Sequence, residues 1–227
     1  MIVLAVETSM GGSSVAVMRR GDASPMALQE GAPAREQAEN LMPLIDAALR
    51  EARVAYSDIG RLAASLGPGS FSGVRASLAA IYGVSIATGA PVVGVSSLEI
   101  MARKFAVARG FAGGPFFIAA PAGREAVYGQ AFHEDAAPAA PPALIPVALW
   151  SGAMIASGVT LAGPAATALS AAAADAPVDE RPCAPDAATL ARMALERTPT
   201  PGLPAPLYLR AADAKPQMSK VLPRAAS

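Results

Sequence analysis

The sequence has very few of the side chains that bind metals or act as nucleophiles. It contains one cysteine, Cys183, and one histidine, His133, among 227 residues. A single cysteine excludes an internal disulfide, and a zinc site needs several Cys or His ligands. His133 lies beside a stretch rich in Ala and Pro, which would have to reach the first half of the chain to complete a Ser-His-Asp triad. We therefore expect no metal centre and assign no catalytic residue.

Excess charge and long apolar runs are also lacking. The chain has 18 Lys and Arg against 18 Asp and Glu, whereas proteins that bind nucleic acid alone normally carry a basic excess. No stretch reaches the roughly 18 uninterrupted apolar residues that span a bilayer. The residues 1–7 have no basic segment followed by a long apolar run, as a signal peptide would. We expect a cytoplasmic protein without a membrane partner, and any contact with RNA is expected to be local or made through a partner.

The first half of the chain alternates apolar runs with helical periodicity. Its hydrophobic content of 53% comes largely from alanine, with only 5% aromatics, so we expect an aliphatic core. Gly11 and Gly12 fall between the first two runs and favour a hairpin, and Pro43 predicts a late start or a kink in the first helix. The expected elements are strands at 2–6, 14–18 and 28–31, a helix at 35–53, a strand at 62–66, a helix at 74–88, a strand at 91–95 and a helix at 97–107.

The second half repeats this pattern more weakly. We predict strands at 116–119, 126–132 and 159–163 and a helix at 186–197. The stretches 135–146 and 171–185 are dominated by Ala and Pro and are predicted to be loops. The order of elements is typical of an α/β protein with mixed sheets flanked by helices, divided into an N-terminal lobe, 1–105, and a smaller C-terminal lobe with a basic tail, 106–227.

Glu7, Thr8 and Ser9 end the first strand. In sugar-kinase and actin-like folds an acidic residue at this place orients a metal-bound water, and the loop amides hold phosphate. Here the acid is Glu rather than Asp, one methylene longer, and no lysine accompanies it. Two interpretations remain open: a degenerate phosphate loop and an ordinary turn with two hydroxyls.

The stretch after the strand at 62–66 is unusually rich in small residues. It lacks the lysine of a phosphate loop, Ser72 breaks the Gly-x-Gly-x-x-Gly spacing, and Phe71 occupies the serine place of a nucleophile elbow. It is either a strand-to-helix turn capped by Ser70 or Ser72 or a backbone that something approaches closely. The motif comprises Gly67, Pro68, Gly69, Ser70, Phe71, Ser72 and Gly73, with Arg75 two residues later.

Two specific motifs carry a resemblance to a known family. Leu-Gly-Pro-Gly-Ser-Phe-Ser-Gly-Val-Arg at 66–75 and Gly-Val-Ser-Ser-Leu at 94–98 closely resemble the TsaB (YeaZ) family. Weaker matches follow in the expected order at 7–9, 41–45, 127–128, 163–165 and 208–215. The resemblance implies a two-lobed ASKHA fold and no catalysis by the chain itself. It also implies a heterodimer with TsaD, which transfers the threonylcarbamoyl group to position 37 of tRNA, TsaE as an ATPase in the larger complex, and TsaC as the maker of the threonylcarbamoyl-adenylate.

The chain departs from this family at two places. Gln37 occupies a position at which many relatives keep a histidine, and an amide is a poor metal ligand, so we expect no cofactor. Pro-Ala-Gly-Arg at 121–124 replaces the usual Asp-Ala-Arg-Arg, which leaves no aspartate there.

The helices at 35–53 and 74–88 each carry apolar or small residues on more than one face, whereas packing on one sheet buries a single face. Such helices are either central core helices or docking surfaces. Ala76, Ala80, Gly83 and Ala87 form a row of small residues that permits close backbone approach. The resemblance implies that these helices bind TsaD and, in its absence, a second copy of the chain. The residues expected to bind the partner are Leu41, Leu44, Ile45, Ala76, Leu78, Ala79, Ile81, Tyr82 and Gly83.

Two other functions are considered. An active ASKHA phosphotransferase for a small molecule would need two complete phosphate loops, an adenosine pocket and a catalytic aspartate. A glycoprotease-like hydrolase is disfavoured by the missing histidines. A separate hypothesis concerns the basic tail, in which Arg210, Lys215, Lys220 and Arg224 outnumber Asp213: this tail helps to place tRNA once a complex has formed.

Overall fold

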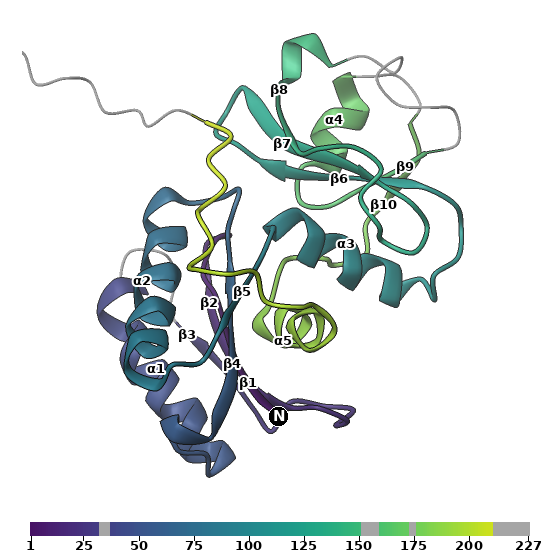
Figure 1. Cartoon of the computed structure of the whole chain (residues 1–227). Coiled ribbons are helices and arrows are strands. Elements are labelled where there is room, and N and C mark those ends of the chain that lie inside the picture. Colours follow the sequence, from purple (N-terminus) through teal and green to yellow (C-terminus); the bar gives the residue numbers. More distant parts are fainter. Residues whose placement is uncertain (32–36, 151–158, 173–175, 211–227) are drawn as a thin grey trace, which may run out of the picture.

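The structure, a computed structural model, describes residues 1–31, 37–150, 159–172 and 176–210. It has two lobes, each built on a five-stranded mixed sheet (Figure 1), which confirms the predicted two-lobed ASKHA-like α/β fold. The first sheet has the order β3-β2-β1-β4-β5, with β1 (Ile2–Glu7), β2 (Ser13–Arg19), β3 (Ala27–Gly31), β4 (Ile59–Ser65) and β5 (Val92–Val95). The second has the order β10-β9-β6-β7-β8, with β6 (Phe116–Pro121), β7 (Ala126–Phe132), β8 (Ala143–Pro146), β9 (Thr160–Ala162) and β10 (Val178–Asp179).

The first sheet is buried on both faces. Strand β1 pairs antiparallel with β2 and parallel with β4, so it lies at the centre. Side chains alternate between the faces of a strand: Leu4 and Val6 belong to one apolar cluster and Val3 and Ala5 to another. Each face therefore needs its own layer of helices.

Helices α1 (Gln37–Ala52) and α2 (Phe71–Thr88) lie side by side and cover one face of the first sheet (Figure 1). Pro43 lies inside α1, so the helix does not start late at the proline. Helix α2 begins three residues before the predicted position, because the Ser70 hydroxyl accepts from the Gly73 N–H and caps it. It ends at Gly89, whose φ of 73° is left-handed and suits glycine.

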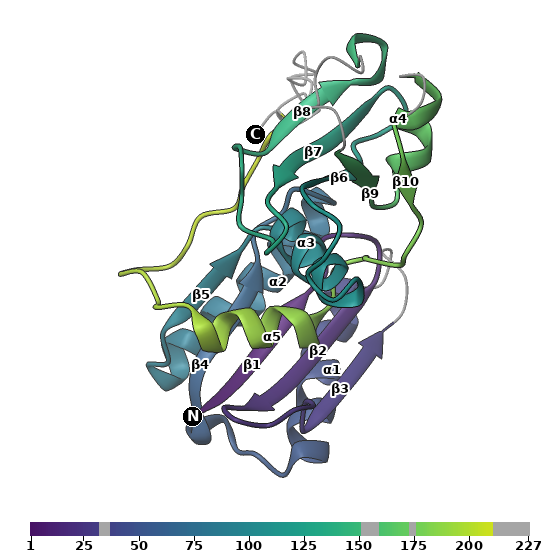
Figure 2. The same cartoon turned by 90° about the vertical axis from the view of Figure 1, so that its right-hand side faces the viewer.

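Helix α5 (Ala187–Glu196) covers the opposite face of the first sheet. Its buried residues include Leu190, Ala191 and Ala194, which join the cluster around Val3 and Ala5. Helix α3 (Ser97–Ala108) instead packs on the second sheet, where the rings of Phe105 and Phe116 are 4.9 Å apart. Figure 2 shows α5 lying across the first sheet and α3 between the two sheets. The predicted division into 1–105 and 106–227 thus differs from the structure, since α5 completes the first lobe.

Two stretches predicted as loops contain regular structure. Strand β8 lies within 135–146, and helix α4 (Ala166–Ala172) and β10 provide structure within 171–185. Both strands are at edges of the second sheet, where proline is tolerated, so the Ala and Pro content misled the prediction. Short 3-10 turns lie at Tyr56–Asp58 and Val147–Leu149. Across the described ranges, no helix combines the length and apolar character needed to cross a bilayer.

Candidate functional site

The loops at the carboxyl ends of β1 and β4 are joined by a buried polar cluster. The Glu7 carboxylate accepts hydrogen bonds from the Ser9 backbone N–H at 2.8 Å, the Ser9 hydroxyl, and the Ser65 hydroxyl at 3.0 Å. The Ser97 hydroxyl donates to the Ser9 hydroxyl at 2.7 Å, and the Thr8 hydroxyl donates to the Gly73 carbonyl at 2.6 Å. These five side chains thus connect β1, β4, α2 and α3 within the first lobe.

The carboxylate of Glu7 faces the protein interior. Only 3% of the residue is exposed, and burial raises its pKa above the ordinary 4.5, although the hydrogen bonds from Ser9 and Ser65 partly oppose this rise. A carboxylate that orients a metal-bound water needs access to solvent and a low pKa. Glu7 has neither, so the arrangement favours the interpretation of residues 7–9 as a structural turn.

The stretch 67–73 is a turn packed against the first loop. A Cβ added to Gly69 would lie 2.3 Å from the Ser9 carbonyl oxygen, and Gly67 has a φ of 86°, so both positions need glycine. The Ser70 N–H donates to the Ser9 carbonyl at 2.7 Å. The group that closely approaches this backbone is therefore the chain's own loop. Of the two predicted capping residues, Ser70 caps α2.

A cleft of about 420 Å³ opens between the two lobes beside these loops. It is lined mainly by Gly, Ala, Ser and Pro residues, and Arg210 is its one charged residue within the described part of the chain. Pro121 lines it where the resemblance implies an aspartate. Three possible metal ligands do not gather anywhere in the described ranges. The described lining thus offers one cation, Arg210, and no carboxylate to a phosphorylated ligand with its metal ion.

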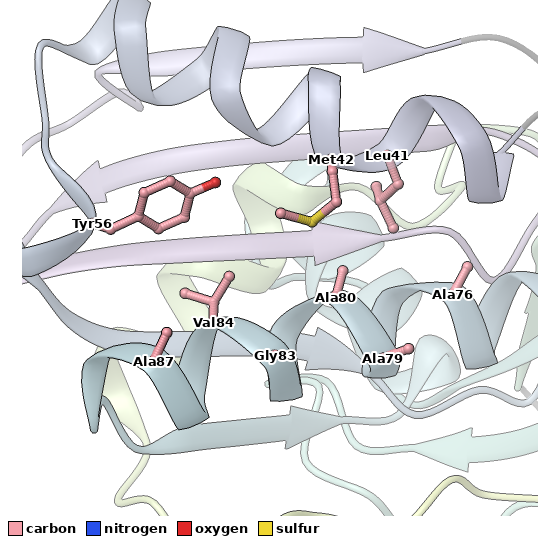
Figure 3. Close-up of a pocket in the computed structure, with 9 residues that line it drawn as sticks. All are labelled: Leu41, Met42, Tyr56, Ala76, Ala79, Ala80, Gly83, Val84 and Ala87. Atoms are coloured by element: carbon pink, nitrogen blue, oxygen red, sulfur yellow. The ribbon is translucent and has the colours of Figure 1, made fainter.

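A second hollow lies on the outer side of the first lobe, between α1 and α2 (Figure 3). It has a volume of about 610 Å³ and is called here the α1–α2 groove. Met42 and Tyr56 lie across it from Ala80 and Val84. Every side chain that lines the groove is apolar except for the Tyr56 hydroxyl, which donates to Asp46 at 2.7 Å. The lining residues are Leu41, Met42, Tyr56, Ala76, Ala79, Ala80, Gly83, Val84 and Ala87.

The residues expected to bind a partner fall into two sets. Leu41, Ile45, Leu78 and Ile81 are at most 4% exposed and belong to the core under the first sheet. Leu44, Ala76 and Tyr82 are half-buried, while Ala79 and Gly83 are exposed. Of these nine residues, Leu41, Ala76, Ala79 and Gly83 line the groove.

Three residues that line the groove, Met42, Tyr56 and Val84, are not among those predicted to face a partner. Ala80 and Ala87, which also line it, belong to the row of small residues at helical spacing in the sequence. Met42, which is 43% exposed, and Tyr56 come from α1 and the following 3-10 turn. No sequence pattern indicates that these two side chains meet α2.

The segment 198–210, called here the C-terminal strap, leaves α5 and crosses α2. The Leu207 N–H donates to the Leu66 carbonyl at 2.7 Å, and the Tyr82 hydroxyl donates to the Pro204 carbonyl. Near its end, the Tyr208 hydroxyl accepts from Arg75 Nε at 3.1 Å. Lys215, Lys220, Arg224 and Asp213 of the predicted tail lie outside the described residues, as does the side chain of Gln37.

Comparison with known proteins identifies the family. Residues 32–179 match the family model "TsaD: tRNA N6-adenosine threonylcarbamoyltransferase". The chain is 33% identical over 103 residues to the tRNA threonylcarbamoyladenosine biosynthesis protein TsaB of Buchnera aphidicola (45% of this chain, 48% of that protein). It is 34% identical over 103 residues to the TsaB of Escherichia coli (45% and 43%). These matches span about half the length of the curated relatives.

A solved structure extends the match over most of the chain. The structure of YeaZ from Pseudomonas aeruginosa superposes with a TM-score of 0.71 and 25% sequence identity, covering 86% of this chain and 91% of that one. The family model, the relatives and this structure all indicate the family that the motifs at 66–75 and 94–98 resemble. The chain belongs to the TsaD-related family and, within it, to the TsaB (YeaZ) group.

Proposed function

We propose that the chain is a non-catalytic, partner-binding subunit in the synthesis of N6-threonylcarbamoyladenosine at position 37 of tRNA. It docks on TsaD through the α1–α2 groove, with TsaE in the larger complex, and forms a homodimer when TsaD is absent. The printed functions of the TsaB relatives support the pathway. The observation that carries the docking role is the apolar groove itself.

The groove has the composition of an interface core. Helix α2 has one charged residue, Arg75, among 18 residues, and its solvent side carries Ala79 and Gly83, which allow a second helix to approach closely. Charged side chains are depleted and Met is enriched at the centre of protein interfaces. The exposed Met42 supplies a flexible apolar side chain that can adapt to a partner.

The interior position of the polar groups supports a non-catalytic role. Glu7, Ser9 and Ser65 hydrogen-bond to one another inside the first lobe, and the described lining of the interlobe cleft contains a single cation. The alternative, a small-molecule phosphotransferase, would need a nucleotide in that cleft. Titration of the isolated chain with Mg-ATP in a calorimeter separates the two functions, because saturable binding with turnover would favour the phosphotransferase.

Substitution of Ala79 by Glu tests the docking surface. Ala79 is exposed in the isolated chain, so the variant should fold normally, whereas a partner would bury an unpaired carboxylate at a cost of several kcal/mol, about 3–5. We expect loss of TsaD in a pull-down and a monomer by light scattering. Leu78→Glu is unsuitable because Leu78 is a core residue that is 4% exposed.

Val107→Glu is the matched control. Val107 is 58% exposed on α3, away from the groove, and the substitution introduces the same charge. It should leave both TsaD capture and self-association unchanged. If Ala79→Glu retained TsaD as well as Val107→Glu does, the groove would not be the docking surface.

A further inference from the structure

A cluster of exposed aromatic rings and arginines lies where the C-terminal strap meets the start of α2. The rings of Phe71 and Tyr208 are 4.9 Å apart, and they are 39% and 44% exposed. The Arg75 guanidinium lies 3.7 Å from the centre of the Phe71 ring. Arg75 is exposed, and none of the ion pairs found in the described ranges neutralises it.

The positive charge continues along the strap towards the second lobe. Arg210, two residues beyond Tyr208, donates to the Ala122 carbonyl at 3.5 Å and lines a hollow of about 370 Å³ together with Arg124. Glu125 is the one acidic residue in the described lining of this hollow. Figure 1 shows the strap passing α2 and rising to the second lobe. Three arginines and two exposed rings therefore lie on or beside the strap as it passes from α2 to the second lobe.

This combination of groups suits a nucleic acid strand. Arginines bind phosphates, and exposed aromatic faces stack bases with little dependence on sequence. An acidic protein would form ion pairs with the arginines, but such pairs would not involve the two exposed rings that lie beside them. The zero net charge of the chain limits such contacts to a local patch of positive charge.

We propose that Phe71, Arg75, Tyr208, Arg210 and Arg124 form an RNA-contact surface on which an unpaired base stacks while the arginines bind the adjoining phosphates. The identification of RNA as the nucleic acid rests on the proposed function in tRNA modification. The surface lies on the first turns of α2 and on the strap. None of its five residues lines the α1–α2 groove, although Arg75 adjoins Ala76, which does line it.

The test uses fluorescence anisotropy of the full chain with a labelled single-stranded RNA of mixed sequence, over a series of salt concentrations. Arg75→Gln should weaken binding and reduce the slope of log affinity against log salt by about 0.7, the loss of one phosphate contact. Tyr208→Leu should weaken binding at least about fivefold through lost stacking. Arg75→Lys and Tyr208→Phe, which keep the charge and the ring, should retain most of the affinity.

The controls separate this inference from folding and from partner binding. Arg19→Gln removes the same charge at the opposite end of the first sheet, where Arg19 pairs with Ile2, and should leave affinity unchanged. Arg124→Gln tests the surface without disturbing the strap, should the Tyr208 variant unfold. Absence of saturable RNA binding at low salt, or equal affinity of all variants, overturns the inference.

Capture of TsaD by the same variants distinguishes the two proposals. If Arg75→Gln and Tyr208→Leu lose RNA but retain TsaD, both proposals stand. If they lose TsaD and retain RNA, the surface binds protein and this inference is wrong. If the unmodified chain binds RNA but never captures TsaD, the proposed docking function fails while the RNA-contact surface remains.

Discussion

Gly83→Ala should change the stability of the chain and its affinity for a partner in opposite directions. Gly83 lies inside α2, where glycine costs about 0.8–1.0 kcal/mol relative to alanine. A Cβ added at Gly83 meets no other described atom within 4 Å, so the isolated chain can accept the methyl group without strain. We expect the monomer to become more stable by about 1 kcal/mol, which corresponds to a rise in Tm of about 2–4 °C for a chain of this size.

The same methyl group should weaken the assembly. If a partner helix packs against the backbone at Gly83, the added Cβ pushes the two helices apart, and overpacking of this kind typically costs about 1–3 kcal/mol. The dissociation constant for TsaD, measured by surface plasmon resonance, should rise about fivefold or more. The Tm should be measured at a dilution at which light scattering shows a monomer, since dimerisation would add to the stability.

Gly89→Ala is the matched control for the backbone argument. Gly89 also has no atom near an added Cβ, but its φ of 73° is left-handed, so alanine should destabilise the chain by about 1–2 kcal/mol. A lower Tm for Gly83→Ala would show that this residue is not at a regular, open helix position. An unchanged affinity for TsaD, despite the higher Tm, would refute the close approach at the groove.

Two further predictions concern the dependence of stability on pH. Because burial raises the pKa of Glu7, the free energy of unfolding should fall as pH rises above 4.5 and through the folded pKa. Urea titrations at several pH values should show that Glu7→Gln removes this fall. A steeper fall in the variant would contradict the assignment. The pKa of Asp186 is shifted in the opposite direction. Burial alone would raise it, but the contacts with Lys104 Nζ at 2.6 Å and with the Thr189 N–H at 2.7 Å lower it below 3.8. Stability should therefore be lost as pH falls below 3.8 through the folded pKa, and Asp186→Asn should remove this acid sensitivity but keep the cap of α5. Asp186→Ala should also lose the cap, at about 0.5–2 kcal/mol; equal stability of the Asn and Ala variants at neutral pH would argue against the capping role.

The first lobe could be predicted from the sequence because its elements follow short-range rules. The β1–β2 hairpin follows from two apolar runs joined by glycines, and α2 ends at Gly89 as the sequence indicates. The position of α5 could not be predicted in the same way. Its periodicity shows that one face is apolar, but the pattern does not say which of two sheets that face will cover.

The candidate sites show the same limit. The motif at 67–73 indicates that glycine is needed. The group that Gly69 must avoid, the Ser9 carbonyl, is 60 residues away in the sequence and is brought close by the parallel pairing of β1 with β4. The sequence indicates that the apolar faces of α1 and α2 are either core faces or a partner surface. Packing against the sheet, which depends on the rotation of each helix, takes Ile45, Leu78 and Ile81 into the core and leaves Ala79 and Gly83 outside.

The return of α5 to the first sheet has a consequence for synthesis of the chain on the ribosome. The face of the first sheet that carries Val3, Ala5 and Met18 is covered by α5, which follows the last strand of that sheet, β5, by about 90 residues of chain. At about 5–20 residues per second, this apolar face waits on the order of 5–20 s for its cover. The nascent chain would therefore be a substrate for chaperones during this interval, and release of a prematurely terminated product would leave an open, aggregation-prone sheet.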